Sequence, residues 1–364
     1  MPSSTSRSRA RRSSKAFSPS RQGEPASAFG YYAIVVGAAL VLLLIAAIAI
    51  AVGPYRLAAR DLVAFLVAEA TGVASPLPLP AESVFLQIRL PRVLAALAVG
   101  AALAASGAAY QSLFRNPLVS PDILGVSAGA AFGAVVGIFL SLPVVAIEAA
   151  SFAGGLAAVI IVYGIAAAIR GRDAVLVLVL AGVVIGALFG AGVGLLKYLA
   201  DPYNQLPAIT FWLLGSLAAA NPHDLTSLLP AVAIGLIPLG LLRWQIDVMT
   251  LGEEEATALG LDTRMLRIVV IAAATLMTSA AVAASGIIGW VGLVVPHLAR
   301  LVVGPAFARL LPVSLLFGAG YLLAVDTAAR TIGAVELPLG VLTAAFGTPV
   351  FLWLLAFGRR PAWS

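Results

Sequence analysis

Long apolar stretches alternate with short polar interruptions along most of this 364-residue chain. Most stretches approach the roughly 20 residues that a helix needs to cross the hydrocarbon core of a bilayer. The pattern predicts an all-α polytopic membrane protein with about ten transmembrane helices. The predicted spans are residues 31–52, 92–111, 122–140, 143–169, 174–199, 225–242, 268–284, 289–303, 312–331 and 337–357.

Three other segments need a separate interpretation. Residues 53–82 contain several charges and four prolines, which predicts an amphipathic loop outside the bilayer. The piece FWLLGSLA, within residues 200–224, is too short to span and predicts a re-entrant or interfacial segment. Residues 31–52 could be the apolar region of a signal peptide, but their length favours a retained first span.

Composition agrees with this class and divides the chain. With 61% hydrophobic residues, 10% charged residues and a mean hydropathy of +1.05, the chain is far more apolar than water-soluble proteins are. Residues 1–22 are basic and serine-rich and contain no acid, which predicts disorder. We therefore expect a disordered cytoplasmic tail at residues 1–30, a transmembrane domain at 31–357 and a cytoplasmic C-terminal tail at 358–364.

The distribution of basic residues predicts the orientation. Ten spans place both termini on the same side of the membrane. If that side is the cytoplasm, 16 of the 22 Lys and Arg residues fall in inner segments, as the positive-inside rule requires. We expect a multi-pass protein of the plasma membrane with both termini cytoplasmic.

Small residues indicate which spans pack closely. Residues 92–111 are rich in Gly, Ala and Ser, a composition typical of helices inside a bundle. Two other spans carry glycines at four-residue spacing, a ridge that lets a neighbouring helix approach to backbone contact. The ridges are Gly125, Gly129, Gly133 and Gly137 in one span and Gly182, Gly186, Gly190 and Gly194 in another.

A weak internal repeat suggests transport. The letters AASG occur at residues 104–107 and 283–286, each followed after the same interval by a proline, Pro117 or Pro296. The offset spans five predicted crossings, so two repeated halves would have inverted topology, a common construction for transporters.

Motifs that the sequence lacks indicate what drives transport. The chain lacks a GxxxxGK[ST] loop and has only two lysines, so it carries no phosphate-binding loop of its own. Its acids Glu148, Asp326 and Glu336 lie near predicted span ends, which gives a proton relay little support. An ion-coupled secondary transporter is the alternative, and a membrane scaffold without transport is a third reading.

Four segments carry a specific resemblance. They read RLPRVLAALAVGAALAASGAAYQSLFRNPLVSPDILGVSAGA, LGEEEATALGLD, GIIGWVGLVVPHLARL and ELPLGVLTAAFGTPVFLWLL. In order and spacing, over about residues 85–357, the chain resembles the permease subunits of type II ABC importers, which carry iron-siderophores, haem or vitamin B12. The resemblance implies a transport subunit that is not itself an enzyme, with an iron-siderophore the favoured cargo and haem or vitamin B12 the alternatives.

The same resemblance implies partners. These are a second permease subunit, identical or paralogous, a cytoplasmic ABC ATPase dimer that binds ATP and Mg, and an extracytoplasmic solute-binding lipoprotein in addition to the lipid bilayer. No cofactor of this chain, no metal site and no nucleic acid are expected. His223 and His297 fall on opposite predicted faces, cannot share a metal and are interpreted as structural.

The acidic segment LGEEEATALGLD lies in the longest charged interruption of the transmembrane domain, residues 243–267. Good helix formers followed by a glycine predict a short helix on the inner face. The resemblance makes it the coupling helix that sits in a groove of the ATPase, whereas the alternative is a solvated loop helix. The expected coupling residues are Leu251, Gly252, Glu253, Glu254, Glu255, Ala258, Leu259 and Gly260.

Two further sites rest on the resemblance. Asn116, Pro117 and Leu118 match a segment near the inner gate of the translocation path, and the alternative is a plain connecting turn. Arg89 and Arg330 match outer pockets that receive acidic residues of the binding protein.

The outer arginines also have simpler explanations. An arginine at a membrane edge often only anchors its helix. Arg330 could in addition pair with Asp326, four residues earlier on the same predicted helix. Arg92 is a neighbour of this set.

Overall fold

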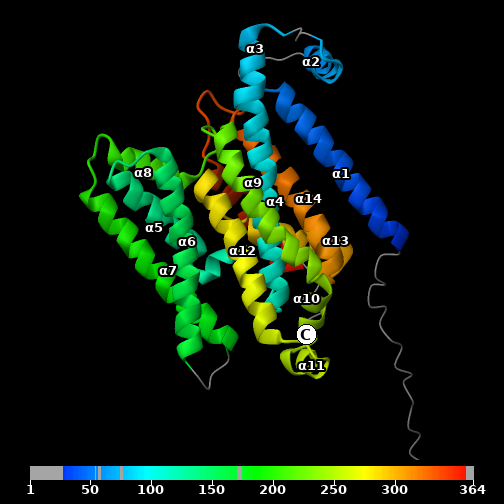
Figure 1. Cartoon of the computed structure of the whole chain (residues 1–364), viewed down its shortest axis with the longest axis vertical. Coiled ribbons are helices and arrows are strands. Elements are labelled where there is room, and N and C mark those ends of the chain that lie inside the picture. Colours follow the sequence, from blue (N-terminus) through cyan, green and yellow to red (C-terminus); the bar gives the residue numbers. More distant parts are fainter. Residues whose placement is uncertain (1–27, 54, 56–58, 74–76, 170–173, 358–364) are drawn as a thin grey trace, which may run out of the picture.

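The computed structural model describes residues 28–53, 55, 59–73, 77–169 and 174–357. Most of the predicted N-terminal tail, the polar turn at residues 170–173 and the C-terminal tail at 358–364 lie outside the described residues. The described part is entirely helical (Figure 1). Its elements are α1 (Ala28–Ala51), α2 (Ala59–Thr71), α3 (Leu79–Ser83), the π-helical turn η1 (Val84–Arg89), α4 (Leu90–Leu113), the 3₁₀ turn η2 (Pro121–Leu124), α5 (Val126–Phe139), α6 (Val144–Ala168), α7 (Ala174–Leu199), α8 (Gln205–Leu214), α9 (Pro222–Leu241), α10 (Arg243–Met249), α11 (Glu253–Ala258), α12 (Thr263–Ser285), α13 (Val291–Val303), α14 (Phe307–Ala329) and α15 (Leu339–Phe357).

The predicted membrane-spanning pattern corresponds to these helices. Seven helical segments within the described residues are long and apolar enough to cross a bilayer: α1, the continuous run α3–η1–α4, α6, α7, α9, α12 and α14. The shorter apolar helices α5, α13 and α15 occupy the other three predicted spans. The all-α polytopic fold class is thus confirmed.

The centre of the bundle is α4. Twenty of its 24 residues are buried, and it packs against α9, α12, α13 and α14. Small residues permit this: a β-carbon at Gly100 would collide with the carbonyl of Gly318, and one at Gly107 with the carbonyl of Gly292. The prediction that this span lies inside the bundle is confirmed.

The first glycine ridge forms a close helix pair. A β-carbon at Gly129 would collide with the carbonyl of Gly154 in α6, and one at Gly133 with the carbonyl of Ala150. Gly125 has a different role, because it is the residue between the end of η2 and the start of α5. Its φ of +78° is a left-handed conformation that glycine adopts without strain.

The second ridge makes contact over only one turn. A β-carbon at Gly182 in α7 would collide with the carbonyl of Ile123, whereas one at Gly186 would only reach 4.0 Å from Ala128. At Gly190 it would meet no atom of the described chain within 4 Å. Gly190 therefore makes no helix contact within the described chain, contrary to the packing prediction, because a strict four-residue spacing turns about 40° round the helix at each step. Phe189 and Gly192 still contact Phe132 of α5, so Gly190 faces away while α7 stays beside α5.

Two segments differ from the sequence prediction in local structure. Residues 53–82 are not a simple loop but hold α2 and α3, and Phe65 and Phe85 pack edge to face at 5.3 Å between ring centroids. The two AASG copies are not equivalent either: Gly107 lies within α4, whereas Gly286, at φ +69°, ends α12. A repeated sequence motif does not by itself produce the same local structure, because the backbone after each AASG copy follows a different path.

The short α8 is anchored among helix ends. Ser216 donates a backbone hydrogen bond to Ser285 at 2.8 Å, and Leu339 donates one to Gly215 at 3.0 Å. These bonds join the ends of α8 and α12 to the start of α15, so irregular backbone at this point is satisfied by protein, as a membrane requires.

We predict that Gly129→Leu prevents correct assembly, because the added side chain would force α5 from α6. The matched variant Gly190→Leu should assemble, since the space beside it is open within the chain. Size-exclusion chromatography of the purified variants after equal expression measures both. Normal assembly of Gly129→Leu would refute the packing role of the first ridge.

Candidate functional site

Polar residues gather at the two ends of the bundle. The directions of the helices define which end is which. Tyr31 near the start of α1 lies under the guanidinium of Arg309 in the first turn of α14, at 5.9 Å, so these two helices run parallel. Asp247 of α10 accepts hydrogen bonds from the backbone N–H groups of Phe307 and Ala308 and thereby caps the same end of α14. The end that holds α10 and α11 is called the inner end, and the opposite end, with α3, the outer end (Figure 1).

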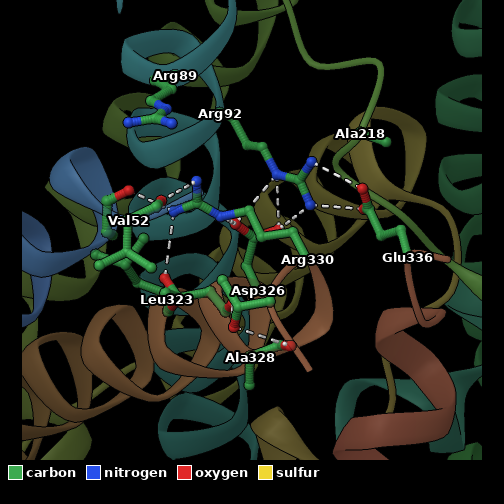
Figure 2. A network of polar contacts seen from close by, with 12 residues as sticks. Val52, Arg89, Arg92, Ala218, Leu323, Asp326, Ala328, Arg330 and Glu336 are labelled. Carbon is green, nitrogen blue, oxygen red and sulfur yellow. Dashed lines mark hydrogen bonds and ion pairs between the residues drawn. The ribbon is translucent and has the colours of Figure 1, made fainter. Parts of the chain in front are cut away.

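The outer end is built around Arg92. Its guanidinium donates to both carboxylate oxygens of Asp326, with Nη2–Oδ1 at 2.7 Å and Nε–Oδ2 at 3.1 Å. It also binds Glu336, with Nη2–Oε1 at 2.6 Å and Nη1–Oε2 at 3.1 Å. Figure 2 shows this fork, which joins the start of α4 to the end of α14 and to the α14–α15 loop.

Burial makes this cluster energetically important. The side chains of Arg92, Asp326 and Glu336 are 9%, 0% and 30% exposed. Removing one partner of a buried ion pair leaves an uncompensated charge and typically costs about 3–5 kcal/mol. The cluster therefore fixes the mutual position of α4 and α14 at the outer end.

Arg89 and Arg330 lie beside this cluster but bind the end of α1. Arg89 donates to the carbonyls of Ile50 at 2.6 Å, Ala51 at 3.2 Å and Tyr55. Arg330 donates to the carbonyls of Val52 at 3.0 Å and Ala49, as Figure 2 shows for Val52. The last carbonyls of a helix have no partner within it, and cations at this end also interact favourably with the helix dipole.

The geometry therefore supports the simpler explanation of these arginines. Arg89 is 4% exposed and the Arg330 side chain 6% exposed, and Arg330 also pairs with Asp326 at 3.6 Å. Neither guanidinium is presented at the surface of this chain. The predicted pairing of Arg330 with Asp326 is observed, whereas a direct docking contact would require these groups to leave their carbonyls.

At the inner end, α11 forms the predicted short helix. Gly252 precedes it with a φ of +138°, and Glu255 of the first turn folds back over Gly252. Glu253 accepts a hydrogen bond from Arg267 at 2.8 Å and one from Thr263 at 3.3 Å, so the helix is held against α12.

The remaining surface of α11 is open. Ala256 is completely buried, whereas Leu251 and Leu259 are 62% and 60% exposed. The other predicted coupling positions, Glu254, Ala258 and Gly260, are also exposed. The helix thus presents acids between two apolar side chains, a surface suited to a protein partner.

The predicted gate residues form a turn between α4 and η2. The side chain of Asn116 accepts a hydrogen bond from the backbone N–H of Leu118 at 2.9 Å, as asparagine commonly does in turns. Arg115 just before it has a φ of +49°, Leu118 is 46% exposed, and Pro117 is half-buried. The geometry shows the connecting turn but leaves its role in a gate as a proposal.

Two features of the site were not predictable from the sequence. The Arg92–Asp326 pair joins residues 234 positions apart, and no periodicity signals such a contact. The cap that Asp247 gives to α14 was also missed, because Asp247 lies in another helix. Burial raises the pKa of Asp247, and the two N–H donors oppose this shift. An acid within the charged 243–267 segment was the only available signal.

The described residues form a bundle of membrane-length helices with an exposed acidic helix at one end, which is the architecture of a polytopic membrane protein. The model of the FecCD transport family matches residues 39–357, and the chain belongs to this family. The chain is 39% identical over 322 residues to the molybdate import system permease protein MolB of Haemophilus influenzae, which covers 88% of this chain and 94% of MolB.

Other relatives agree. The chain is 42% identical over 272 residues to a protein of Helicobacter pylori named as an iron chelatin transport system permease, covering 75% of this chain and 82% of that protein. The structure of a metal-chelate type ABC transporter in an inward-facing conformation matches with a TM-score of 0.80 and 37% identity, over 90% of this chain and 99% of that one. The protein is thus a permease of an ABC importer, in which a partner ATPase hydrolyses ATP.

We predict that Asp326→Asn lowers the free energy of unfolding by about 3–5 kcal/mol, because the buried charge of Arg92 loses the fully buried one of its two carboxylate partners. Denaturant unfolding of the purified chain in detergent measures this. The exposed pair Arg60–Asp61 supplies the control, and Asp61→Asn should change stability little. An equal effect of both variants would contradict the structural role of the cluster.

Proposed function

We propose that this permease carries an iron chelate, with an iron-siderophore the favoured cargo, inward across the plasma membrane. The family membership, the relative named for iron chelatin and the structure named for a metal chelate support this class. The relative named for molybdate keeps a second cargo class open, and haem and vitamin B12 are further alternatives. The ion-coupled secondary transporter is no longer favoured.

The observation that carries the ATP-driven mechanism is the exposed acidic helix α11. It lies at one end of the bundle and is tied to α12 through Glu253 and Arg267. We propose that a cytoplasmic ABC ATPase dimer grips this helix, so that a movement of the ATPase is passed to α12. This places the inner end, and both termini, in the cytoplasm. Asn116, Pro117 and Leu118 then lie near the inner gate of a path formed with a second permease subunit.

We further propose that a solute-binding lipoprotein docks at the outer end. Arg89 and Arg330 support that surface by holding the end of α1, since their hydrogen bonds go to its last carbonyls. Docking would therefore depend on them even without direct contact.

We predict that Glu254→Arg combined with Glu255→Arg lowers the amount of ATPase that co-purifies by at least about tenfold. Lost charge-assisted contacts of about 1.5–3 kcal/mol each account for this size. Asp61→Arg, a single charge reversal at the outer end, should leave co-purification unchanged. Normal ATPase recovery with the double reversal would remove α11 from the coupling interface.

For the outer end, we predict that Arg89→Gln and Arg330→Gln lower the melting temperature of the chain and the stimulation of ATPase activity by binding protein together. The reason is that the carbonyls of α1 lose their donors. Stimulation that disappears at an unchanged melting temperature would instead show that the guanidinium groups contact the binding protein directly.

Cargo is tested by uptake of a labelled panel into proteoliposomes that contain the complete importer. An iron-siderophore should be taken up and should compete with other iron chelates. Uptake of molybdate or vitamin B12 with no uptake of any iron chelate would overturn the proposed cargo but leave the importer class intact.

A further inference from the structure

A long apolar groove lies on the surface of the bundle between α6 and α9. Its floor is α12, which packs against both α6 and α9, and these two helices form its walls. The groove has a volume of about 820 Å³ and is lined almost wholly by apolar side chains. Ile160 and Ile234 on the two walls are 71% and 60% exposed.

Toward the inner end this groove continues into a smaller, charged hollow of about 360 Å³. Tyr163 lines both. One helical turn beyond Tyr163, α6 contributes Ala166 and Ala167. On α12, Arg264 lies one turn before Ile268, and Arg267 directly precedes Ile268. Because residues three or four apart share a helix face, Tyr163 and Arg264 place the two hollows end to end along α6 and α12, and together they are called the channel.

The charge of the inner hollow is positive. Arg267 is 11% exposed and donates to Glu253, whereas Arg264 is exposed at the mouth. Two guanidinium groups thus face one carboxylate, which leaves an excess of one positive charge at the end of an apolar groove. Guanidinium groups bind phosphate with charge-assisted hydrogen bonds.

We propose that this channel binds an anionic glycerophospholipid, with its phosphate at Arg264 and Arg267 and an acyl chain in the groove between α6 and α9. Apolar lining over the membrane-embedded part and a cationic mouth at its edge match the two parts of such a lipid. A zwitterionic lipid fits the groove equally but lacks the net charge that the mouth favours.

The site adjoins the coupling helix without belonging to its exposed surface. Arg267 binds Glu253 of α11, so a phosphate at this mouth would share the guanidinium that ties α11 to α12. Lipid charge would thereby act on the link between α11 and the bundle.

The test is native mass spectrometry of the full-length chain in detergent, titrated with phosphatidylglycerol or phosphatidylcholine. Phosphatidylglycerol should bind at least about fivefold more tightly than phosphatidylcholine. Arg264→Gln should lower this preference by about fivefold, the size expected for one arginine near a lipid surface. Arg243→Gln removes the same charge from another exposed inner-end position and should change nothing.

A second variant tests the acyl part. A side chain at Gly164 would enter open space in the groove without collision, so Gly164→Leu should fold and should weaken both lipids equally. Gly190→Leu, also in open space but on α7, is its control.

Equal binding of the two lipids, or equal losses in the test and control variants, would overturn the proposal. So would a Gly164→Leu chain that changes its oligomeric state while lipid binding is unchanged, because the groove would then hold a second copy. None of these readouts uses transport, so each outcome is independent of the proposed cargo and of the ATPase.

Discussion

The close approach of α4 to its neighbours is the constraint on which the rest of the structure depends. Lipid tails are as apolar as leucine, so helices in a bilayer gain little from burying apolar surface and associate through close packing and hydrogen bonds instead. Gly100 meets Gly318, and Gly107 meets Gly292, at backbone contact. The first of these contacts holds α14 beside α4 and so brings Asp326 to Arg92.

This packing explains why the outer charges are tolerated. A guanidinium group near the membrane is costly unless it is paired. Arg92 is paired twice, and Arg89 and Arg330 satisfy carbonyls that α1 could not satisfy itself. The guanidinium groups of Arg89, Arg92 and Arg330 thus bind partners within the chain, whereas α11 at the inner end keeps its acids exposed. The two ends therefore differ in how many of their charged groups are available to a partner.

Much of the fold was predictable because membrane spans are specified by local composition. Length and hydropathy identified the helices, and the small residues of α4 correctly indicated the bundle interior. Pairing between helices was harder, because a strict four-residue spacing turns about 40° round the helix at each step and its later members leave the contact face. The ridge of α7 therefore failed at Gly190, although the same spacing held for Gly129 and Gly133 in α5.

The candidate site shows the same division. The short acidic helix was predictable from its own sequence, since its acids, helix formers and terminal glycine are contiguous. The partners of Arg92 and the burial of Arg89 were not, because they depend on where α14 and α1 end in space. Charged residues at predicted span ends therefore correctly indicated the candidate site. They did not indicate which group each charged side chain would bind.

The continuity of α12 has a mechanical consequence. Its 23 residues run unbroken from Thr263, beside α11, to Ser285, which is bonded to Ser216 after α8. A straight helix of this length measures about 34 Å, so a tilt of about 5° displaces one end by about 3 Å relative to the other. At the far end the backbone of Gly286 lies directly against Trp212, leaving no slack to absorb such a shift. Because the helix is stiff and its far end is tightly packed, a small angular change at the inner end becomes an atomic-scale displacement of α8 and the start of α15.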